Sequence, residues 1–276
     1  MKNFIIFLIF INNLFSLEKY KEENILSIWN VEEKKLKLVE HRKLKGLEQL
    51  NNLKFHDELW KIISEFYPED VINRIDKFVV FSDNNKNNRN GMSGLIESVD
   101  GTNNSRFILS VDIADAYYGN KISLEVFLNL LVHEFFHLVS LNDTQISPNY
   151  TKGVKIYEGY TYENSYINKF YEKFWNNSLG KRLEMLELNS KLSFAQKETI
   201  REELYKYNQD KFVDTYAMTN MVEDIAVSFE DFIRLNKGYL GDSLKDKKID
   251  FFYSYADLVK YKNHFIQKKK EMIRKY

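Results

Sequence analysis

The stretch that most restricts how this chain can fold runs from Leu124 to Asn142, with Ser123 directly before it. From that serine it reads SLEVFLNLLVHEFFHLVSLN, and apolar residues occur on nearly every side of the helix that it predicts. A helix of this kind is buried, so the rest of the chain has to surround it. Ser123 suits the N-cap position, and Glu125 favours the positive end of the helix dipole.

This predicted helix carries three polar side chains that are costly to bury unless they are paired or bound to metal: His133, Glu134 and His137. They form the pattern H-E-x-x-H. Residues four apart lie about 40° apart around a helix, so the two imidazoles can reach one zinc ion from one side. Glu134 can then take a proton from a water that the metal activates. Two histidines bonded to neighbouring carbonyls are the alternative, which the helical setting of the motif disfavours.

A catalytic zinc takes three protein ligands and leaves one position for water. Asp143 is one candidate for the third ligand, but Ser140 stands where a glycine would turn the chain back. Glu223 is the better candidate, because it lies near the middle of a largely apolar helix predicted from Phe212 to Leu235. Tyr216 lies seven residues earlier on the same helix face, where its phenol could stabilise an oxyanion. A buried ion pair for Glu223 and core packing for Tyr216 are the alternatives.

The composition excludes several classes of function. The 276 residues, 44% of them hydrophobic, are enough for one sizeable core in a single domain. The 40 basic and 40 acidic residues cancel, so we expect no nucleic acid as a partner. Cysteine is absent, which excludes disulfides, thiol catalysis and a cysteine zinc site. The 2 prolines and 10 glycines fit a mostly helical chain.

Residues 1–16 predict a secretory signal peptide. Lys2 is followed by an apolar run from Phe4 to Ile11 and by Ser16, a small residue near the expected cleavage point. The run is too short to span a bilayer as a stable helix, and an uncleaved N-terminal anchor is the alternative. We therefore expect cleavage near Ser16, a secreted, periplasmic or cell-surface location, and no stable membrane insertion after cleavage.

The rest of the sequence predicts a small sheet before the buried helix and mostly helices after it. Residues 17–45 are charged and lightly apolar and predict one or two short helices or an ordered arm, and 47–66 predict an amphipathic helix that stops before Pro68. Strands are predicted at Ile75–Phe81, Leu95–Val99 and Arg106–Ile113. The last of these is expected to be an edge strand that pairs with an extended peptide, with an interior strand as the alternative.

In the second half of the chain, the predicted segments alternate between irregular and helical structure. The Tyr-rich stretch 153–163 is expected to be irregular. Helices are predicted over 165–175, over 181–207 as one or two helices, and over 249–276. No repeat and no linker indicates a second domain.

The motif HEFFH, followed by Tyr216 and then by Glu223 seven residues later, resembles the gluzincin metallopeptidases. The subgroup it resembles most contains anthrax lethal factor, the secreted Pro-Pro endopeptidases and zinc-binding metallopeptidases found among bacterial lipoproteins. The segments SYINKFYEKFW, TNMVEDIA and FFYSYADLVKYKN are also similar to the last of these. The resemblance covers roughly Arg106 to the C-terminus. It implies His133, His137 and Glu223 as zinc ligands, Glu134 as the base, and Tyr216 as the oxyanion donor.

Two features depart from that family. The separation of 86 residues between His137 and Glu223 is longer than in the simplest gluzincins. Val227 stands four residues after Glu223, where the thermolysin type has an aspartate. Asp224 is adjacent to the expected ligand, and its role as a partner of the site is open.

Taken together, these features predict a secreted zinc endopeptidase of the α+β class, mostly helical and zincin-like. Its two lobes would be a sheet lobe with the active helix, 17–142, and a helical lobe, 143–276. We expect a monomer that acts on a peptide or protein substrate. Two other functions are open: a binding or adhesin-like module with a vestigial zinc site, and a zinc amidase that acts on cell-wall peptides. Glu134 argues against the first, because a structural site needs no base.

Overall fold

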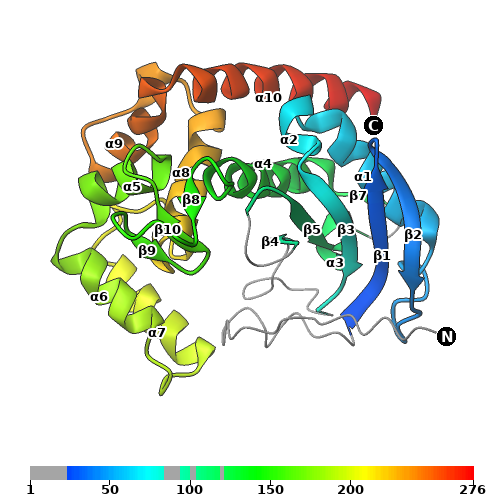
Figure 1. Ribbon diagram of the computed structural model, residues 1–276, viewed down its shortest axis with the longest axis horizontal. Coiled ribbons are helices and arrows are strands. Elements are labelled where there is room, and N and C mark those ends of the chain that lie inside the picture. The colour runs from blue at the N-terminus through cyan, green and yellow to red at the C-terminus, as the bar shows by residue number, and fades with distance from the viewer. Residues whose placement is uncertain (1–23, 84–93, 100–103, 119–120) are drawn as a thin grey trace.

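The computed structural model describes residues 24–83, 94–99, 104–118 and 121–276. In this part of the chain, 52% helix and 18% strand confirm the predicted α+β class. The sheet comes before the long central helix α4 (Leu124–Ser140), and most of the helices come after it (Figure 1). The predicted signal peptide, 1–16, lies outside the described residues.

A five-stranded mixed sheet has the strand order β2-β1-β3-β5-β4. β3 and β5 are parallel, and the other neighbouring pairs are antiparallel. The strands are β1 Ile25–Glu32, β2 Lys35–His41, β3 Ile75–Phe81, β4 Gly94–Ser98 and β5 Phe107–Asp112. The three strands expected before the buried helix are thus confirmed as β3, β4 and β5.

Two expectations about this sheet are wrong. The first concerns residues 17–45, which are predicted to be short helices or an arm. From residue 24 on they form the hairpin β1–β2, because β1 pairs with β3 and buries residues such as Leu26 in the sheet. β5, expected at the edge, is an interior strand between β3 and β4. It is buried along nearly its whole length, which is typical of a strand that has neighbours on both sides. The edge strands of this sheet are β2 and β4.

Ten helices occur among the described residues. Besides α4 they are α1 Leu53–Phe66, α2 Glu69–Ile72, α3 Ile113–Ala116, α5 Tyr166–Phe170, α6 Ser178–Glu187, α7 Phe194–Tyr205, α8 Met221–Arg234, α9 Leu244–Phe251 and α10 Ala256–Lys275. A π-helical turn, Tyr171–Trp175, continues α5, and short 3-10 turns cover Tyr216–Met218, Lys237–Tyr239 and Phe252–Ser254. Short strands form two small sheets: β6 Tyr117–Tyr118 with β7 Lys121–Ile122, and β8 Ile146–Ser147, β10 Gly159–Thr161 and β9 Lys155–Ile156.

Several helix predictions are confirmed in outline, with different ends. α1 stops before Pro68 as predicted, but it begins only at Leu53, where the Asn52 side chain accepts a hydrogen bond from the Lys54 amide. The helix expected over 249–276 is divided, because Tyr255 has an extended backbone between α9 and α10. The stretch 153–163, expected to be irregular, contains β9 and β10.

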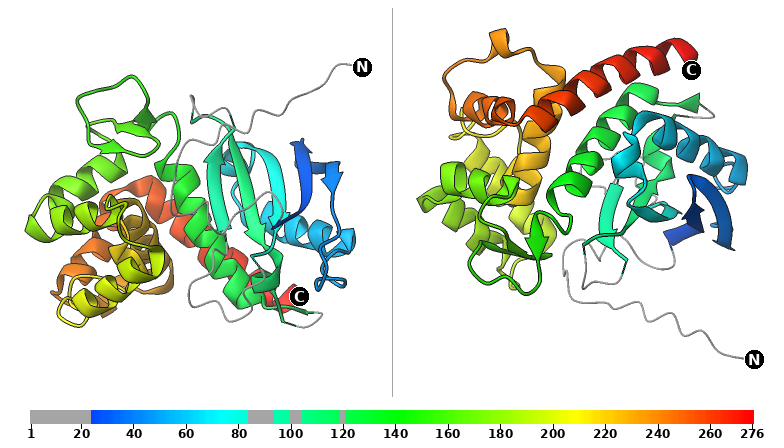
Figure 2. Two further views of the ribbon diagram at one scale, coloured as in Figure 1. Left: turned by 90° about the horizontal axis from the view of Figure 1, so that it is seen from below. Right: turned by 45° about the horizontal axis from the view of Figure 1, so that its top comes forward.

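The central helix α4 lies between the large sheet and the helices that follow, as the views in Figure 1 and Figure 2 agree. Phe135 packs against Phe265 of α10, with 4.6 Å between ring centroids, and Phe136 stacks on Phe229 of α8 at 4.4 Å. On the sheet side, the Tyr67 hydroxyl donates to the Leu131 carbonyl at 2.8 Å. These contacts fix the helix that carries the H-E-x-x-H motif from both sides. Among the described helices, none combines the length and hydropathy needed to cross a membrane.

His56 on α1 is a buried histidine of the sheet side. Its Nδ1 lies 2.7 Å from Ser27 Oγ, and its Nε2 lies 2.8 Å from the Leu50 carbonyl oxygen. Because a carbonyl can only accept, Nε2 carries the proton, and Nδ1 accepts from the serine hydroxyl. Burial lowers the pKa of His56 to about 4, so the ring is neutral in the folded protein at ordinary pH.

This histidine should make the protein less stable in mild acid. Between pH 6.5, its ordinary pKa, and pH 4, the unfolded chain binds the proton and the folded protein does not. The free energy of unfolding should therefore fall by about 1.4 kcal/mol for each pH unit in this range, to an upper limit of about 3.4 kcal/mol. Denaturant titrations of the wild type and of His56→Gln should show a steeper fall in the wild type. Equal slopes would contradict this account of His56.

Candidate metal centre

Three side chains that could hold one metal ion converge beside α4: His133, His137 and Glu223. His133 Nε2 lies 3.0 Å from His137 Nε2 and 3.1 Å from Glu223 Oε2, and His137 Nε2 lies 3.5 Å from the same oxygen. Both histidines are buried, and Glu223 is partly buried. The structure thus brings together the three ligands expected from the sequence, from segments 86 residues apart.

The geometry of these donors fits a tetrahedral metal. At metal–ligand distances of about 2.0–2.1 Å, tetrahedral ligands lie about 3.3–3.4 Å apart. The three separations here, 3.0, 3.1 and 3.5 Å, lie close to that value. Two imidazole nitrogens and one carboxylate oxygen form a donor set typical of catalytic zinc sites.

Glu230 on α8 is a hydrogen-bond partner of His133 that the sequence did not lead us to expect. Its Oε1 lies 2.7 Å from His133 Nδ1. With a metal bound, the proton of His133 would therefore be on Nδ1, and Nε2 would be free to bind the ion. Glu230 stands seven residues after Glu223, two turns along the same helix. The seven-residue spacing is the sequence signal by which Glu230 could have been identified. Val227, at the thermolysin-type position, is buried and apolar, so it cannot accept a hydrogen bond from the histidine.

Glu223 lies in the first turn of α8 and not in the middle of a long helix. The predicted helix 212–235 is interrupted at Asn220, whose backbone is extended. The Asn220 side chain accepts hydrogen bonds from the amides of Val222 at 2.8 Å and Glu223 at 3.0 Å, so it caps a helix that begins at Met221. The positive end of the helix dipole also favours a carboxylate at this position.

Tyr216 lies beside the site, although not for the reason expected. It belongs to a separate 3-10 turn, so the argument that it shares a helix face with Glu223 is wrong. The turn is fixed by Asp214, whose Oδ1 accepts from the Ala217 amide at 2.8 Å. The Tyr216 ring lies 5.9 Å from the His133 ring, centroid to centroid. The Tyr216 side chain is 50% exposed, so only its hydroxyl end lies within the site. There, desolvation and the nearby carboxylates of Glu223 and Glu134 raise the pKa of the phenol, so it keeps its proton.

Glu134 is buried next to the three donors. Its Oε2 has no hydrogen-bond partner among the described residues, and burial raises the pKa of its carboxyl while the two histidines lower it. Gly94, the first residue of the edge strand β4, lies against it: a Cβ at Gly94 would be 2.5 Å from Glu134 Oε1. The open side of Gly94 therefore faces the carboxylate, and a side chain at this position would require Glu134 to shift.

Two other acidic residues considered from the sequence have structural roles. Asp143, the rival third ligand, is outside the metal cluster and forms an ion pair with Arg74 at 2.9 Å. Asp224 is fully buried and accepts from Trp175 Nε1 at 2.6 Å and from Lys248 Nζ at 2.5 Å. Asp224 thus anchors the first turn of α8, and with it the position of the neighbouring Glu223.

Comparison with known proteins gives no significant match to a family model, to a curated protein or to a solved structure.

Proposed function

We propose that this protein is a zinc metallopeptidase that hydrolyses peptide bonds in extended segments of peptides or proteins. The observation that carries the proposal is the buried Glu134 carboxylate, which lies beside the cluster of His133, His137 and Glu223 and against Gly94 of β4. Zinc bound at the cluster would lower the pKa of a water toward about 7 and polarise the scissile carbonyl.

Glu134 acts as the general base in this scheme. It takes a proton from the attacking water and later delivers it to the leaving amine. An oxygen without a hydrogen-bond partner among the described residues and a raised pKa both suit a group that must accept and return a proton. A structural metal site requires no such group, so Glu134 favours a catalytic role over a vestigial site.

The surrounding residues orient the reactants. Glu230 holds the His133 ring through Nδ1, and Tyr216 donates a hydrogen bond to the oxyanion that forms on the substrate. Within the part of the chain that the structure describes, β4 has no strand beyond it, so its edge could pair with an extended peptide, in place of β5, which has neighbours on both sides. A peptide paired there would pass Glu134 at Gly94.

The setting of this activity follows from the signal peptide expected at 1–16, which would place the enzyme outside the cell or at its surface. The proposed hydrolysis involves neither a nucleic acid nor a membrane anchor. We propose that the folded enzyme acts as a monomer on its peptide or protein substrate.

A peptide library tests this function. The purified protein, loaded with zinc, is incubated with proteome-derived peptides, with chelator, and with chelator followed by added zinc. Cell-wall peptides with non-protein amide bonds form a parallel set. Cuts at peptide bonds that chelator removes and zinc restores support the proposal. Hydrolysis of the cell-wall set alone would identify an amidase instead, and no hydrolysis in either set would contradict a hydrolase.

Replacing Tyr216 by phenylalanine should slow turnover without changing the fold. Phenylalanine keeps the ring and loses only the donor, which matters most when the oxyanion forms. Loss of one such donor costs about 10²–10³-fold, mainly in kcat, with KM little changed. Steady-state kinetics on a cleaved peptide check this, with zinc content and unfolding temperature measured alongside. A change of less than about threefold would return Tyr216 to a packing role.

A further inference from the structure

The second histidine of the cluster lacks the partner that the first one has. His133 donates through Nδ1 to Glu230, whereas His137 Nδ1 is buried and makes no hydrogen bond among the described residues. For the Nε2 lone pair of His137 to face the cluster, the proton of this ring must be on Nδ1. A buried N–H without an acceptor is unfavourable, so an acceptor is to be expected nearby.

Glu158 presents the complementary case, an acceptor without a donor. Its Oε2 is buried and makes no hydrogen bond among the described residues. Burial raises the pKa of the Glu158 carboxyl, and the positive charge of His137 lowers it. The negative charge of Glu223 raises it further. Two residues of the cluster thus act electrostatically on the Glu158 carboxyl.

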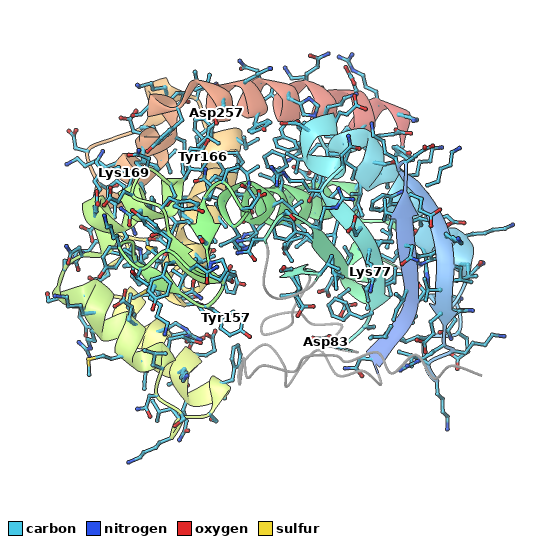
Figure 3. The ribbon with its side chains drawn as sticks, in the orientation of Figure 1. Lys77, Asp83, Tyr157, Tyr166, Lys169 and Asp257 are labelled. Carbon is cyan, nitrogen blue, oxygen red and sulfur yellow. The ribbon has the colours of Figure 1, made fainter. Side chains whose placement is uncertain are left out.

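The backbone around Glu158 is held in place by specific contacts. Glu158 lies in the turn between β9 and β10, directly before Gly159. Gly159 has a φ of 142°, and a Cβ there would lie 3.0 Å from the Ser147 carbonyl oxygen. The Glu158 carbonyl accepts from Asn104 Nδ2 at 3.2 Å, and the Asn104 carbonyl accepts from the amide of Asp143, just after α4, at 2.9 Å. These contacts tie the turn to the end of the helix that carries His137. Tyr157, the residue before Glu158, is placed in Figure 3 on the side of the helical part that faces the sheet.

We propose that Glu158 is a positioning residue for His137, whose Nδ1–H it accepts through one buried water. The two polar atoms are not bonded directly, and a water between them would satisfy both the donor and the acceptor. Glu158 would then fix the tautomer and orientation of His137, as Glu230 does for His133. The role rests on the proposed function, in which His137 is a metal ligand.

Zinc affinity tests this role independently of turnover. The dissociation constant for zinc is measured by competition with a chromophoric chelator in the wild type, Glu158→Met and Glu158→Gln. Methionine keeps the length of the side chain and removes the acceptor, so affinity should fall by about 10–100-fold. Glutamine keeps an acceptor oxygen and should retain most of the affinity. Glu163→Gln, at an exposed glutamate five residues further along the chain, is the matched control and should stay within threefold. A Glu158→Met protein within threefold of the wild type would overturn the proposal.

The Nδ1 proton of His137 gives a second readout in the zinc-loaded protein, where Nε2 binds the metal. Nitrogen-15 NMR of the zinc-loaded wild type should show this proton protected from exchange with solvent, and in Glu158→Met the protection should be lost. Equal exchange in the two proteins would contradict the role of Glu158. A wild type that binds zinc but hydrolyses no peptide would contradict the proposed function, and zinc affinity and NMR would still decide on Glu158.

Discussion

Replacing Glu134 by glutamine is expected to lower peptide turnover by about 10²–10⁴-fold, with metal content and unfolding temperature unchanged. Glutamine has nearly the same size and fits against Gly94 as glutamate does, but it cannot take a proton from water. Glu134 is proposed as the base and is not one of the three metal donors, so the metal should remain bound.

The matched control for this variant is Glu125→Gln, on the same helix. Glu125 is exposed and lies 3.9 Å from Lys269, in the first turn of α4. Its replacement should leave turnover within about threefold. A Glu134→Gln enzyme that works at a similar rate to this control would remove Glu134 from the mechanism.

Replacing Glu223 by alanine should empty the metal site. Alanine removes one of the three donors. Loss of a residue that only hydrogen-bonds to a ligand lowers metal affinity by about 10–100-fold, so loss of a ligand itself should lower zinc affinity by more than that. Asp143→Ala should bind zinc like the wild type, because Asp143 is paired with Arg74 away from the cluster. Metal analysis after dialysis compares the two variants at equal protein concentration.

The opposite pattern would show that the ligand set is wrong. If Asp143→Ala lost its zinc while Glu223→Ala kept it, the third ligand would be Asp143. The unfolding temperatures of both metal-free proteins show whether either change has acted through the fold, since Asp224 beside Glu223 anchors the same turn of α8.

The central helix could be predicted in nearly all respects because its sequence leaves few alternatives. An apolar run of this length must be buried, and the two histidines four residues apart must then share one side of it. The strands β3, β4 and β5 could also be predicted, because short β-branched and aromatic runs between turn residues favour a sheet. These features depend on neighbours in the sequence, which is the information that a single sequence provides.

The parts that could not be predicted depend on contacts between distant segments. The hairpin β1–β2 is stabilised by the pairing of β1 with β3, about 50 residues further along the chain. β1 (ILSIWNVE) is itself rich in β-branched and aromatic residues, but the charged residues on both sides of it obscure this signal. The edge position of β4 follows from strand order, which no local pattern records. Whether Asn220 stays within a helix or caps a new one depends on the packing of the α8 face that follows it.

The candidate site shows the same division. The helical spacing of His133, Glu134 and His137 predicts their arrangement, whereas Glu158 lies in a short turn that only the fold brings near His137. Glu230 falls between these cases, because its seven-residue spacing from Glu223 is visible in the sequence but has no meaning until the partner of His133 is known.

Titration of zinc into the metal-free protein, followed by turnover of one cleaved peptide, tests most directly whether the cluster holds a catalytic metal. The account predicts no turnover without metal, a linear rise with added zinc, and a plateau at one zinc ion per chain. The same titration of Glu223→Ala should give no rise in this range. Turnover that persists in the metal-free wild type, or that does not depend on zinc, would contradict the account.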